Sequence, residues 1–452
     1  MKPIEGIMTN KGLGFLFIIL FLTKTLAIYS TNFNLFGDEA QYWIWSKNLE
    51  FGYFSKPPFL SWFIRLHTSI FGESFLSLKI LPSFVYILTS VTIYDICKSI
   101  GLNKNSSLSC SLLFLFIPAV SFSSFVISTD LFLLLFWTLS LNILFKIRKN
   151  PNISNFVLLG IMLGLAFLSK YAAIYFIICF LIYFFIDDKI RVIIKENYFK
   201  TLVCFVCILL IILPNIMWNF NNSWVTIQHT SDNANFENLD ISFFRGLLFL
   251  VTQILMVSPF LFFANIAIFS KIKIDENQKM LLVFSIPIFL IVFIEAIIVR
   301  ANANWAAPAL VSFFIFLYVN VVNLKPIYMR LNIVFNFIFC FLLFIIIGFS
   351  FNVSLFDRVS GINDYAQAVK SVADKKGITD YVISDRLLYS NFVYELKDYD
   401  LNFYMPHKKN SRITNHFKIS SPLKSDIERS FVFIGHVEEI DYLENKFTCK
   451  EK

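Results

Sequence analysis

The sequence predicts an all-α polytopic membrane protein of about 11 spans, and at most about 13, with outer interfacial helices and a small C-terminal α/β domain. Two observations predict this fold class. Hydrophobic residues make up 57% of the 452 residues and charged residues only 15%, whereas soluble proteins carry about a quarter charged residues. Apolar stretches of membrane-spanning length also recur along the chain. A cytosolic enzyme, a coiled coil and a disordered chain are therefore excluded.

The apolar stretches define the elements of the membrane domain. A helix needs about 20 apolar residues to cross the hydrocarbon layer of a bilayer. Eleven stretches approach that length: 12–30, 79–97, 107–127, 129–146, 155–170, 171–187, 201–218, 244–270, 280–299, 304–323 and 332–351. They predict a membrane domain over residues 1–351, with two long outer loops at 31–78 and 219–243.

Lysine and arginine in the connections predict the orientation of the chain, because cytoplasmic loops carry an excess of these residues. With the N-terminus in the cytoplasm, sixteen of them fall inside and seven outside. The net charge of +8 is explained in this way, and no nucleic-acid partner is expected. An odd number of spans then places a C-terminal domain, residues 352–452, outside the cytoplasm. Alternating patterns at 381–385 and 431–435 predict strands in that domain.

Polar side chains collect at the predicted outer face. Asp38 and Glu39 follow the first span directly. At helical spacing, four side chains share one side of a helix that would lie along the interface: Asp38, Gln41, Tyr42 and Trp45. A second amphipathic stretch covers residues 59–71. An aromatic belt explains the tryptophans, but it does not explain two adjacent carboxylates at the membrane surface.

Further charges lie at the same face. Lys56 precedes a double proline, which forces an extended turn and fixes where the lysine points. Polar residues also separate closely spaced spans at 128–130, 169–171 and 300–305, and each of these could be a simple polar turn. Together they place six charged side chains at one surface: Asp38, Glu39, Lys56, Asp130, Lys170 and Arg300. This mixed-charge site is suited to the phosphate of a lipid-linked substrate.

Two charges lie deeper, Lys24 within the first span and Glu295 within the ninth. Burying either without compensation is costly, so each is expected to face a partner or a hydrated cavity. A transporter or flippase of lipid-linked sugars would need more such charges across the midplane, and often two halves that echo each other. An oligosaccharide polymerase or ligase would have no acidic pair after the first span, and a structural scaffold would not need Asp130 and Lys170 at span ends.

The segment GDEAQYWIWSKNLEFGYFSKPPFLSWFIRL resembles the first outer loop of bacterial membrane glycosyltransferases of the C-type fold. That group is related to dolichyl-phosphate-mannose–protein mannosyltransferases and to undecaprenyl-phosphate-aminoarabinose lipid A transferases. The resemblance extends through STDLFLLLFW (128–137), GLAFLSKY (164–171), PNIMWNFNNSWVTIQH (214–229) and ANANWAAPAL (301–310), and covers most of residues 12–323. It implies a bundle of membrane helices in the bacterial inner membrane, with the active site facing the periplasm.

The resemblance also implies roles for individual residues. Asp38 and Glu39 match the acidic pair of the family and would be catalytic. Lys56 matches the lysine-proline element of the lipid A transferases, where many other members have histidine, and would bind the donor phosphate with Lys170 and Arg300. The residues expected to bind substrate or support the site are Tyr42, Tyr53, Asp130, His229 and Asn304.

The expected activity is transfer of a single sugar from a polyprenyl-phosphate donor to an acceptor on the outer side of the membrane. Lipid A or another envelope glycan or lipid is the expected acceptor, and a protein O-mannosyltransferase-like activity is the alternative. A single displacement at the anomeric carbon would invert its configuration. No glycine-rich phosphate loop is present, so no nucleotide cofactor is expected. The sequence has no closely spaced His and Asp residues of the kind that hold a divalent metal. Whether the activity depends on a metal is left open.

Overall fold

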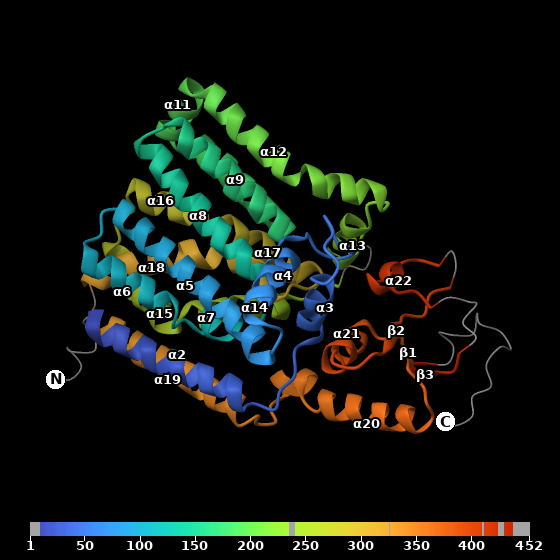
Figure 1. Cartoon of the computed structure of the whole chain (residues 1–452). Helices are drawn as coiled ribbons and strands as arrows, with labels where there is room; N and C mark the ends of the chain where they lie inside the picture. The colour runs from blue at the N-terminus through green and yellow to red at the C-terminus, as the bar shows by residue number, and fades with distance from the viewer. Residues whose placement is uncertain (1–9, 235–239, 325, 409–410, 424–428, 437–452) are drawn as a thin grey trace.

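All eleven predicted stretches are helical in the computed structural model, which describes residues 10–234, 240–324, 326–408, 411–423 and 429–436 (Figure 1). Seven of them lie on described helices, or on two consecutive helices, that are long and apolar enough to cross a membrane. These are α2 (Asn10–Ser30), α5 (Phe75–Ser99), α8 (Thr129–Lys149), α12 (Tyr198–Asn221), α16–α17 (Glu276–Val283 and Ile286–Ile298), η3–α18 (Ala303–Ala306 and Ala307–Leu324) and α19 (Pro326–Gly348).

The other four stretches form shorter helices. The pair α14 and α15 bends by 99° at its break, and the stretch 107–127 divides into α6 and α7. Their bounds are α6 (Lys104–Phe114), α7 (Pro118–Ser123), α9 (Ile153–Ser169), η1 (Tyr171–Ala173), α10 (Ile174–Ile186), α14 (Phe243–Val257) and α15 (Pro259–Ala267). The polytopic helical architecture is therefore confirmed, whereas the number of membrane crossings stays a prediction.

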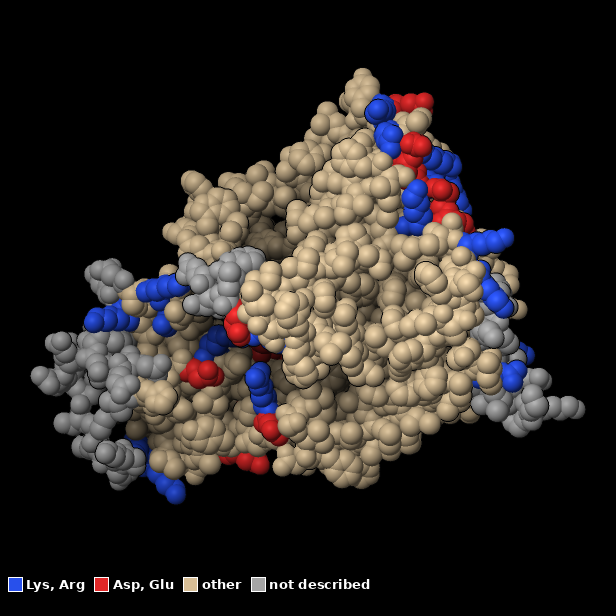
Figure 2. Space-filling model, turned by 180° about the vertical axis from the view of Figure 1, so that it is seen from behind, with Lys and Arg blue, Asp and Glu red and all other residues tan. Residues whose placement is uncertain are grey.

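Charge and exposure fit a chain embedded in a membrane. Large apolar side chains are exposed along α12, among them Phe205, Leu210 and Met217, and a soluble protein rarely exposes so much apolar surface. Figure 2 shows a broad band without Lys, Arg, Asp or Glu between two charged regions. One region includes the far ends of α8 and α10, where Arg148 pairs with Asp187 at 3.1 Å. The chain is a multi-pass membrane protein.

The connections predicted for the outer side lie at the other end of the bundle (Figure 1). They form α3 (Gly37–Trp45), α4 (Phe59–Phe71) and α13 (Val225–Ala234), while α11 (Asp188–Glu196) and η2 (Phe269–Lys271) are further short helices between spans. Both predicted interfacial helices are therefore present. The Glu39 carboxylate accepts the Phe36 N–H at 2.8 Å, which satisfies a donor at the start of α3. Pro57 and Pro58 precede α4 and set its start.

The C-terminal residues form a small α/β unit. Its elements are η4 (Ser354–Val359), α20 (Ile362–Lys375), β1 (Asp380–Ile383), α21 (Arg386–Glu395), β2 (Asn402–Tyr404), α22 (Phe417–Ser420) and β3 (Phe431–Ile434). The strands make a parallel sheet in the order β2-β1-β3, with Asp380 opposite both Asn402 and Phe431. The two predicted strands are confirmed. The sequence prediction missed β2, which has only 3 residues.

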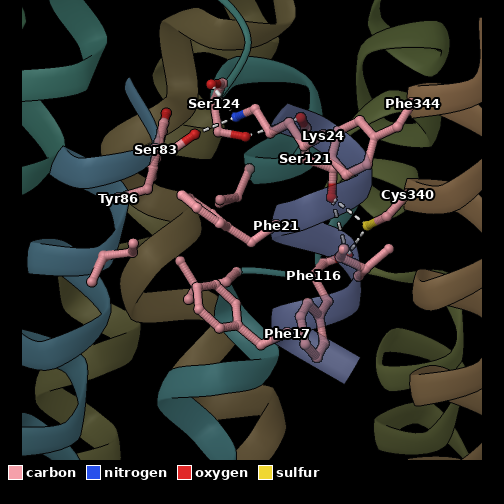
Figure 3. A pocket seen from close by; sticks show the side chains of 14 residues that line it. Phe17, Phe21, Lys24, Ser83, Tyr86, Phe116, Ser121, Ser124, Cys340 and Phe344 are labelled. Atoms are coloured by element: carbon pink, nitrogen blue, oxygen red, sulfur yellow. Dashed lines mark hydrogen bonds between the residues drawn. The ribbon is translucent and has the colours of Figure 1, made fainter. Parts of the chain in front are cut away.

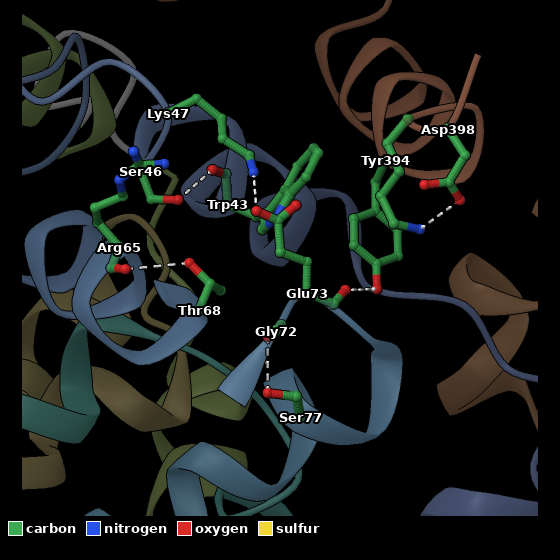
Figure 4. Close-up of polar contacts among 11 residues, drawn as sticks. Trp43, Ser46, Lys47, Arg65, Thr68, Gly72, Glu73, Ser77, Tyr394 and Asp398 are labelled. Atoms are coloured by element: carbon green, nitrogen blue, oxygen red, sulfur yellow. Dashed lines mark hydrogen bonds and ion pairs between the residues drawn. The ribbon is translucent and has the colours of Figure 1, made fainter. Parts of the chain in front are cut away.

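This unit packs closely against α3 and the loop between α4 and α5 (Figure 4). Gly37 permits the contact, since a Cβ there would lie 2.5 Å from the Cβ of Leu387 on α21. Trp43 meets the Tyr394 ring edge-to-face at 5.1 Å, and the Tyr394 hydroxyl donates to the Glu73 carbonyl at 3.1 Å. Residues more than 300 positions apart are held together in this way, and the start of α21 is fixed over α3.

Candidate active site

Three span ends meet at Asp130, which lies in the first turn of α8 and is 6% exposed. One carboxylate oxygen accepts a hydrogen bond from Lys170 Nζ at 2.6 Å, and the other accepts one from Asn304 Nδ2 at 2.8 Å. Lys170 ends α9 and Asn304 lies in η3, so α8, α9 and η3 each contribute one side chain. The structure thus brings together three of the predicted residues from segments 40 and 174 positions apart.

Lys56 lies next to this group, and no described residue forms an ion pair with it. Among the described residues its ammonium makes no hydrogen bond or ion pair, although Asp130 and Asp38 are close enough to act on it. Burial and, to a smaller extent, the charge of the neighbouring Lys170 together lower the pKa of Lys56 to about 8, against the opposing effect of the two carboxylates. Two ammonium groups therefore share the region around Asp130, which favours binding of an anion.

Tyr53 fixes the loop that presents Lys56. It is fully buried, its ring stacks on Trp45 at 4.5 Å, and its hydroxyl donates to the Trp45 carbonyl at 2.9 Å. The Tyr53 N–H donates to the Lys56 carbonyl at 3.1 Å, and Thr226 donates to the Tyr53 carbonyl at 2.8 Å. Tyr53 was expected to bind or support substrate, and its contacts favour the supporting role.

Asp38 projects from α3 on the side of Lys56. It is exposed and accepts a hydrogen bond from Arg386 Nη1 at 2.9 Å, while the same nitrogen donates to Gln41 Oε1 at 2.9 Å. Tyr42 is buried beside it. Burial, then the charge of Asp38, raises the pKa of Tyr42 well above its usual value of 10.0, so its hydroxyl keeps its proton. Asp38 and Tyr42 can therefore offer an acceptor and a donor to the same substrate.

The Glu39 side chain points away from Asp38 and into the protein interior. It is 1% exposed, forms an ion pair with the fully buried Lys79 at 2.5 Å, and accepts the Ile127 N–H at 2.7 Å. Consecutive residues differ by about 100° around a helix, so the two acids of α3 cannot face one surface. Glu39 was expected to be catalytic with Asp38. Its contacts suit a positioning residue that holds α3 against α5 and the chain before α8, and its catalytic role stays a prediction.

The remaining predicted residues lie at the edges of the site. The His229 ring, on α13, lies 4.9 Å from the Phe54 ring, and burial lowers its pKa, with Lys56 and Arg386 adding to the effect. Arg300 is exposed and makes no hydrogen bond or ion pair with any described residue. The geometry therefore does not join Arg300 to the group around Asp130, and its predicted contact with the donor phosphate stays a prediction.

Sequence reasoning missed three residues that the structure places here. Arg386 and His416 come from the C-terminal unit, and Lys79 from α5 neutralises Glu39. Arg386 follows β1 at the start of α21, where loops of α/β folds often carry functional side chains. The position of Arg386 after a predicted strand could have marked it as a functional residue. No local sequence pattern, however, indicates that the C-terminal unit packs against α3.

The two charged residues predicted within spans, Lys24 and Glu295, differ in whether a described residue binds them. Lys24 on α2 donates to Ser83 Oγ at 2.5 Å and to the Ser124 carbonyl, at the end of an otherwise apolar cavity between α2, α5 and α19 (Figure 3). The expectation of a polar partner is confirmed for Lys24. Glu295 on α17 is partly buried and has no hydrogen bond or ion pair within the described part of the chain.

The side-chain chemistry of the site suits a phosphate better than a bound cation. No group of three or more His, Cys, Asp or Glu side chains in the described ranges is arranged to hold a metal ion. The residues that converge are two lysines, an arginine, two aspartates and a tyrosine, which can bind an anion, orient an attacking oxygen and accept a proton. This combination fits group transfer from a phosphate ester.

The chain resembles known proteins in sequence and in fold. The family model of dolichyl-phosphate-mannose-protein mannosyltransferases matches residues 55–218. Lipid A galacturonosyltransferase RgtD of Rhizobium johnstonii is 29% identical over 417 residues, covering 89% of this chain and 85% of that protein.

Solved structures of ArnT from Cupriavidus metallidurans share the fold. The apo structure superposes with a TM-score of 0.64 at 14% identity, covering 90% of this chain and 87% of that one. The structure bound to undecaprenyl phosphate has a TM-score of 0.56 at 16% identity, covering 85% of this chain and 75% of that one. The predicted fold class, with its helical membrane part and small C-terminal sheet, is confirmed.

Proposed function

We infer that the chain, which belongs to the superfamily of membrane glycosyltransferases with the C-type fold, transfers one sugar from a polyprenyl-phosphate donor to lipid A. The observation that carries this proposal is the Lys56 ammonium, which lies beside the Lys170–Asp130 pair, has no ion-pair partner within the described part of the chain and favours an anion at the membrane surface. The named activity of the relative RgtD supports lipid A as acceptor, and the ArnT structure with undecaprenyl phosphate supports a polyprenyl-phosphate donor.

We place this site on the periplasmic side of the inner membrane. The start of α2 and helix α11 lie at the end of the bundle opposite to α3 and α13 (Figure 1), and the sequence next to them is rich in lysine and arginine, as expected of a cytoplasmic face. Polyprenyl-linked sugars and lipid A present their headgroups at such a surface. The C-terminal unit then lies in the periplasm beside the reacting groups.

The proposed reaction is one displacement at the anomeric carbon. An acceptor oxygen forms a bond to this carbon while the bond from the carbon to the donor phosphate oxygen breaks, and the polyprenyl phosphate leaves with the electron pair. Lys56 and Lys170 stabilise the charge that develops on the phosphate, which lowers the barrier because the interaction strengthens in the transition state. Configuration inverts, unlike in a two-step retaining reaction.

The role of Asp38 in the proposed reaction depends on the chemical nature of the acceptor. If the attacking group is a hydroxyl, Asp38 accepts its proton, and Arg386 holds the carboxylate in place at 2.9 Å. If the attacking group is a phosphate oxygen, no proton has to be removed, and Asp38 orients the substrate instead. Tyr42 keeps its proton and can donate a hydrogen bond to either substrate.

The proposal is tested with the full chain in proteoliposomes that contain lipid A and synthetic polyprenyl-phosphate sugars. Mass spectrometry should show lipid A heavier by one sugar, with one polyprenyl phosphate released for each. Arg65→Ala, which changes an exposed arginine on α4, should behave as wild type. Movement of the intact donor across the bilayer without transfer would instead indicate a flippase. Transfer to added peptides alone would indicate a protein O-glycosyltransferase.

The low pKa of Lys56 predicts a pH dependence of donor use. Free Lys56 loses its proton as the pH rises through about 8, and the neutral amine no longer attracts the donor phosphate. We expect kcat/KM for the donor to be flat from pH 6.5 to 7.5 and to fall by about tenfold per pH unit well above 8. Lys56→Arg should keep its charge at high pH and flatten the decline. A wild-type profile that stays level to pH 9.5 would contradict this assignment.

A further inference from the structure

A polar face lies at the end of α12 next to α13, in a largely apolar helix. Asn215, Trp218 and Asn219 are three and four positions apart, so their side chains share one side of the helix. Asn215 is 4% exposed and Asn219 is 2% exposed, whereas the apolar side chains of Ile216 and Met217 are exposed. Buried amides are nearly always hydrogen-bonded, and here the partners lead to both lysines of the proposed site.

The polar face of α12 holds the loop between α3 and α4. Asn215 Nδ2 donates to the Phe51 carbonyl at 2.6 Å, and Trp218 Nε1 donates to Glu50 Oε2 at 2.6 Å. Gly52 permits this close approach, since a Cβ there would lie 2.4 Å from the Trp218 ring. The loop is therefore attached to α12 a few residues before the lysine that it presents to the site.

The same face reaches the chain beside Lys170. Tyr171 is the next residue, and its hydroxyl donates to Asn215 Oδ1 at 2.8 Å. Asn219 Nδ2 donates to the same hydroxyl at 3.2 Å. The Asn215 amide thus bonds through its nitrogen to the loop of Lys56 and through its oxygen to the residue after Lys170.

The two lysines repel each other, so their approach has to be held by the surrounding fold. The charge of Lys170 contributes to the low pKa of Lys56 for this reason. Lys170 is held by Asp130 at 2.6 Å, whereas no described residue forms an ion pair with Lys56. The attachment of the Lys56 loop to α12 and Tyr171 opposes the repulsion. Both charges are then in place before a phosphate binds, which is the arrangement that stabilises a transition state best.

We propose that Asn215 and Tyr171 are positioning residues that fix the separation of Lys56 and Lys170, so that both ammonium groups reach one donor phosphate. This inference rests on the proposed function. Both residues act through the lysines and not by contact with the reacting atoms. Loss of the link is expected to let Lys56 move outward, away from Lys170 and toward solvent.

Asn215→Leu tests the link, because it removes both amide bonds and keeps nearly the same volume. In proteoliposomes we expect kcat/KM for the polyprenyl-phosphate donor to fall by about 10- to 100-fold, since small misplacements of a reacting constellation have effects of this size. The alkaline limb of the pH profile should also move to higher pH, by about 0.5 pH units or more. Lys56 would lose burial and the repulsion of Lys170, and both changes raise its pKa.

The direction of this shift distinguishes positioning from a general loss of stability. The charged or titratable groups that face Lys56 are Lys170, Asp130, Asp38, Arg386 and His229. The effect of Lys170 on the pKa of Lys56 is the largest among the charges. Movement of the loop therefore raises that pKa even though Asp130 also becomes more distant. A protein that is merely less stable has fewer active molecules, and each of them keeps the wild-type limb.

Tyr171→Phe is a milder variant, because it removes one hydroxyl and leaves the bond from Asn215 to Phe51. It should move the alkaline limb in the same direction. Since both variants break one link, the double variant should resemble Asn215→Leu alone in kcat/KM. Tyr175→Phe is the matched control: the Tyr175 hydroxyl, on α10, makes no hydrogen bond with a described residue, and its loss should leave the wild-type profile.

The outcomes separate this inference from the proposed function. An alkaline limb that stays at the wild-type pH in both single variants would overturn the positioning role, whatever the loss of activity. Fully additive losses in the double variant would overturn it as well, because the two residues would then act separately. Either result leaves the glycosyltransferase in place. A wild-type chain that transfers no sugar from polyprenyl phosphate would contradict the proposed function, and this inference with it.

Discussion

Lys56→Met is expected to lower kcat/KM for sugar transfer by about 100- to 1,000-fold, the loss seen when a preorganised charge-stabilising group is removed. The methionine fills the space of the lysine stem and removes only the charge. Because the Lys56 ammonium has no ion-pair partner among the described residues, its removal leaves no carboxylate unpaired. Folding stability should therefore stay within about 0.5 kcal/mol of wild type.

This combination of lost activity and kept stability is the signature of a ligand-binding lysine. Transfer is measured in proteoliposomes with the polyprenyl-phosphate donor, and stability by thermal unfolding of the same preparation. Arg65→Ala serves as a control for loss of a positive charge at the same end of the molecule. Turnover of Lys56→Met within a few-fold of wild type would remove Lys56 from the mechanism.

Glu39→Gln is expected to destabilise the fold by about 3–5 kcal/mol, because it leaves Lys79 buried without a counter-charge. Lys79 is fully buried at 0% exposure, and Glu39 is its ion-pair partner at 2.5 Å. Replacing both residues with apolar ones, in Glu39→Leu combined with Lys79→Met, should recover most of that stability. Thermal unfolding is measured in one detergent for the wild type, Glu39→Gln and the double variant. A Glu39→Gln protein as stable as the wild type would contradict the account.

The same pair of variants decides whether Glu39 takes part in the reaction. A positioning residue can be replaced when its partner is replaced with it, so the double variant should regain measurable transfer along with its stability. If the double variant is as stable as wild type and yet inactive, Glu39 has a catalytic role that its buried position does not indicate.

Much of the fold was predictable because its signals are local. Apolar stretches of span length predicted every long helix of the bundle, and helical spacing in the first outer loop predicted α3 and α4. The residues at 128–130 and 169–171 lie at span ends, and helices that share an end of a bundle bring such residues together. For that reason Asp130 and Lys170 could be assigned to one surface in advance, and the structure places their charged groups 2.6 Å apart.

Other parts of the site depend on long-range packing that no local pattern encodes. Arg386 reaches Asp38 only because Gly37 lets α21 approach α3, a contact between segments about 350 residues apart. Lys79 stands at the start of the predicted stretch 79–97, yet the helix α5 begins at Phe75, and Lys79 is buried within it as the ion-pair partner of Glu39. Arg300 shows the reverse: it lies four residues before Asn304, but it stays exposed while Asn304 reaches Asp130.

The most direct test of the account is a structure of the protein with polyprenyl phosphate bound, determined by cryo-electron microscopy in lipid nanodiscs. The account predicts the phosphate oxygens about 3 Å from the Nζ atoms of both Lys56 and Lys170, with Asp38 on the side from which the acceptor approaches. A phosphate bound elsewhere on the chain, with both amines still free of it, would contradict the account.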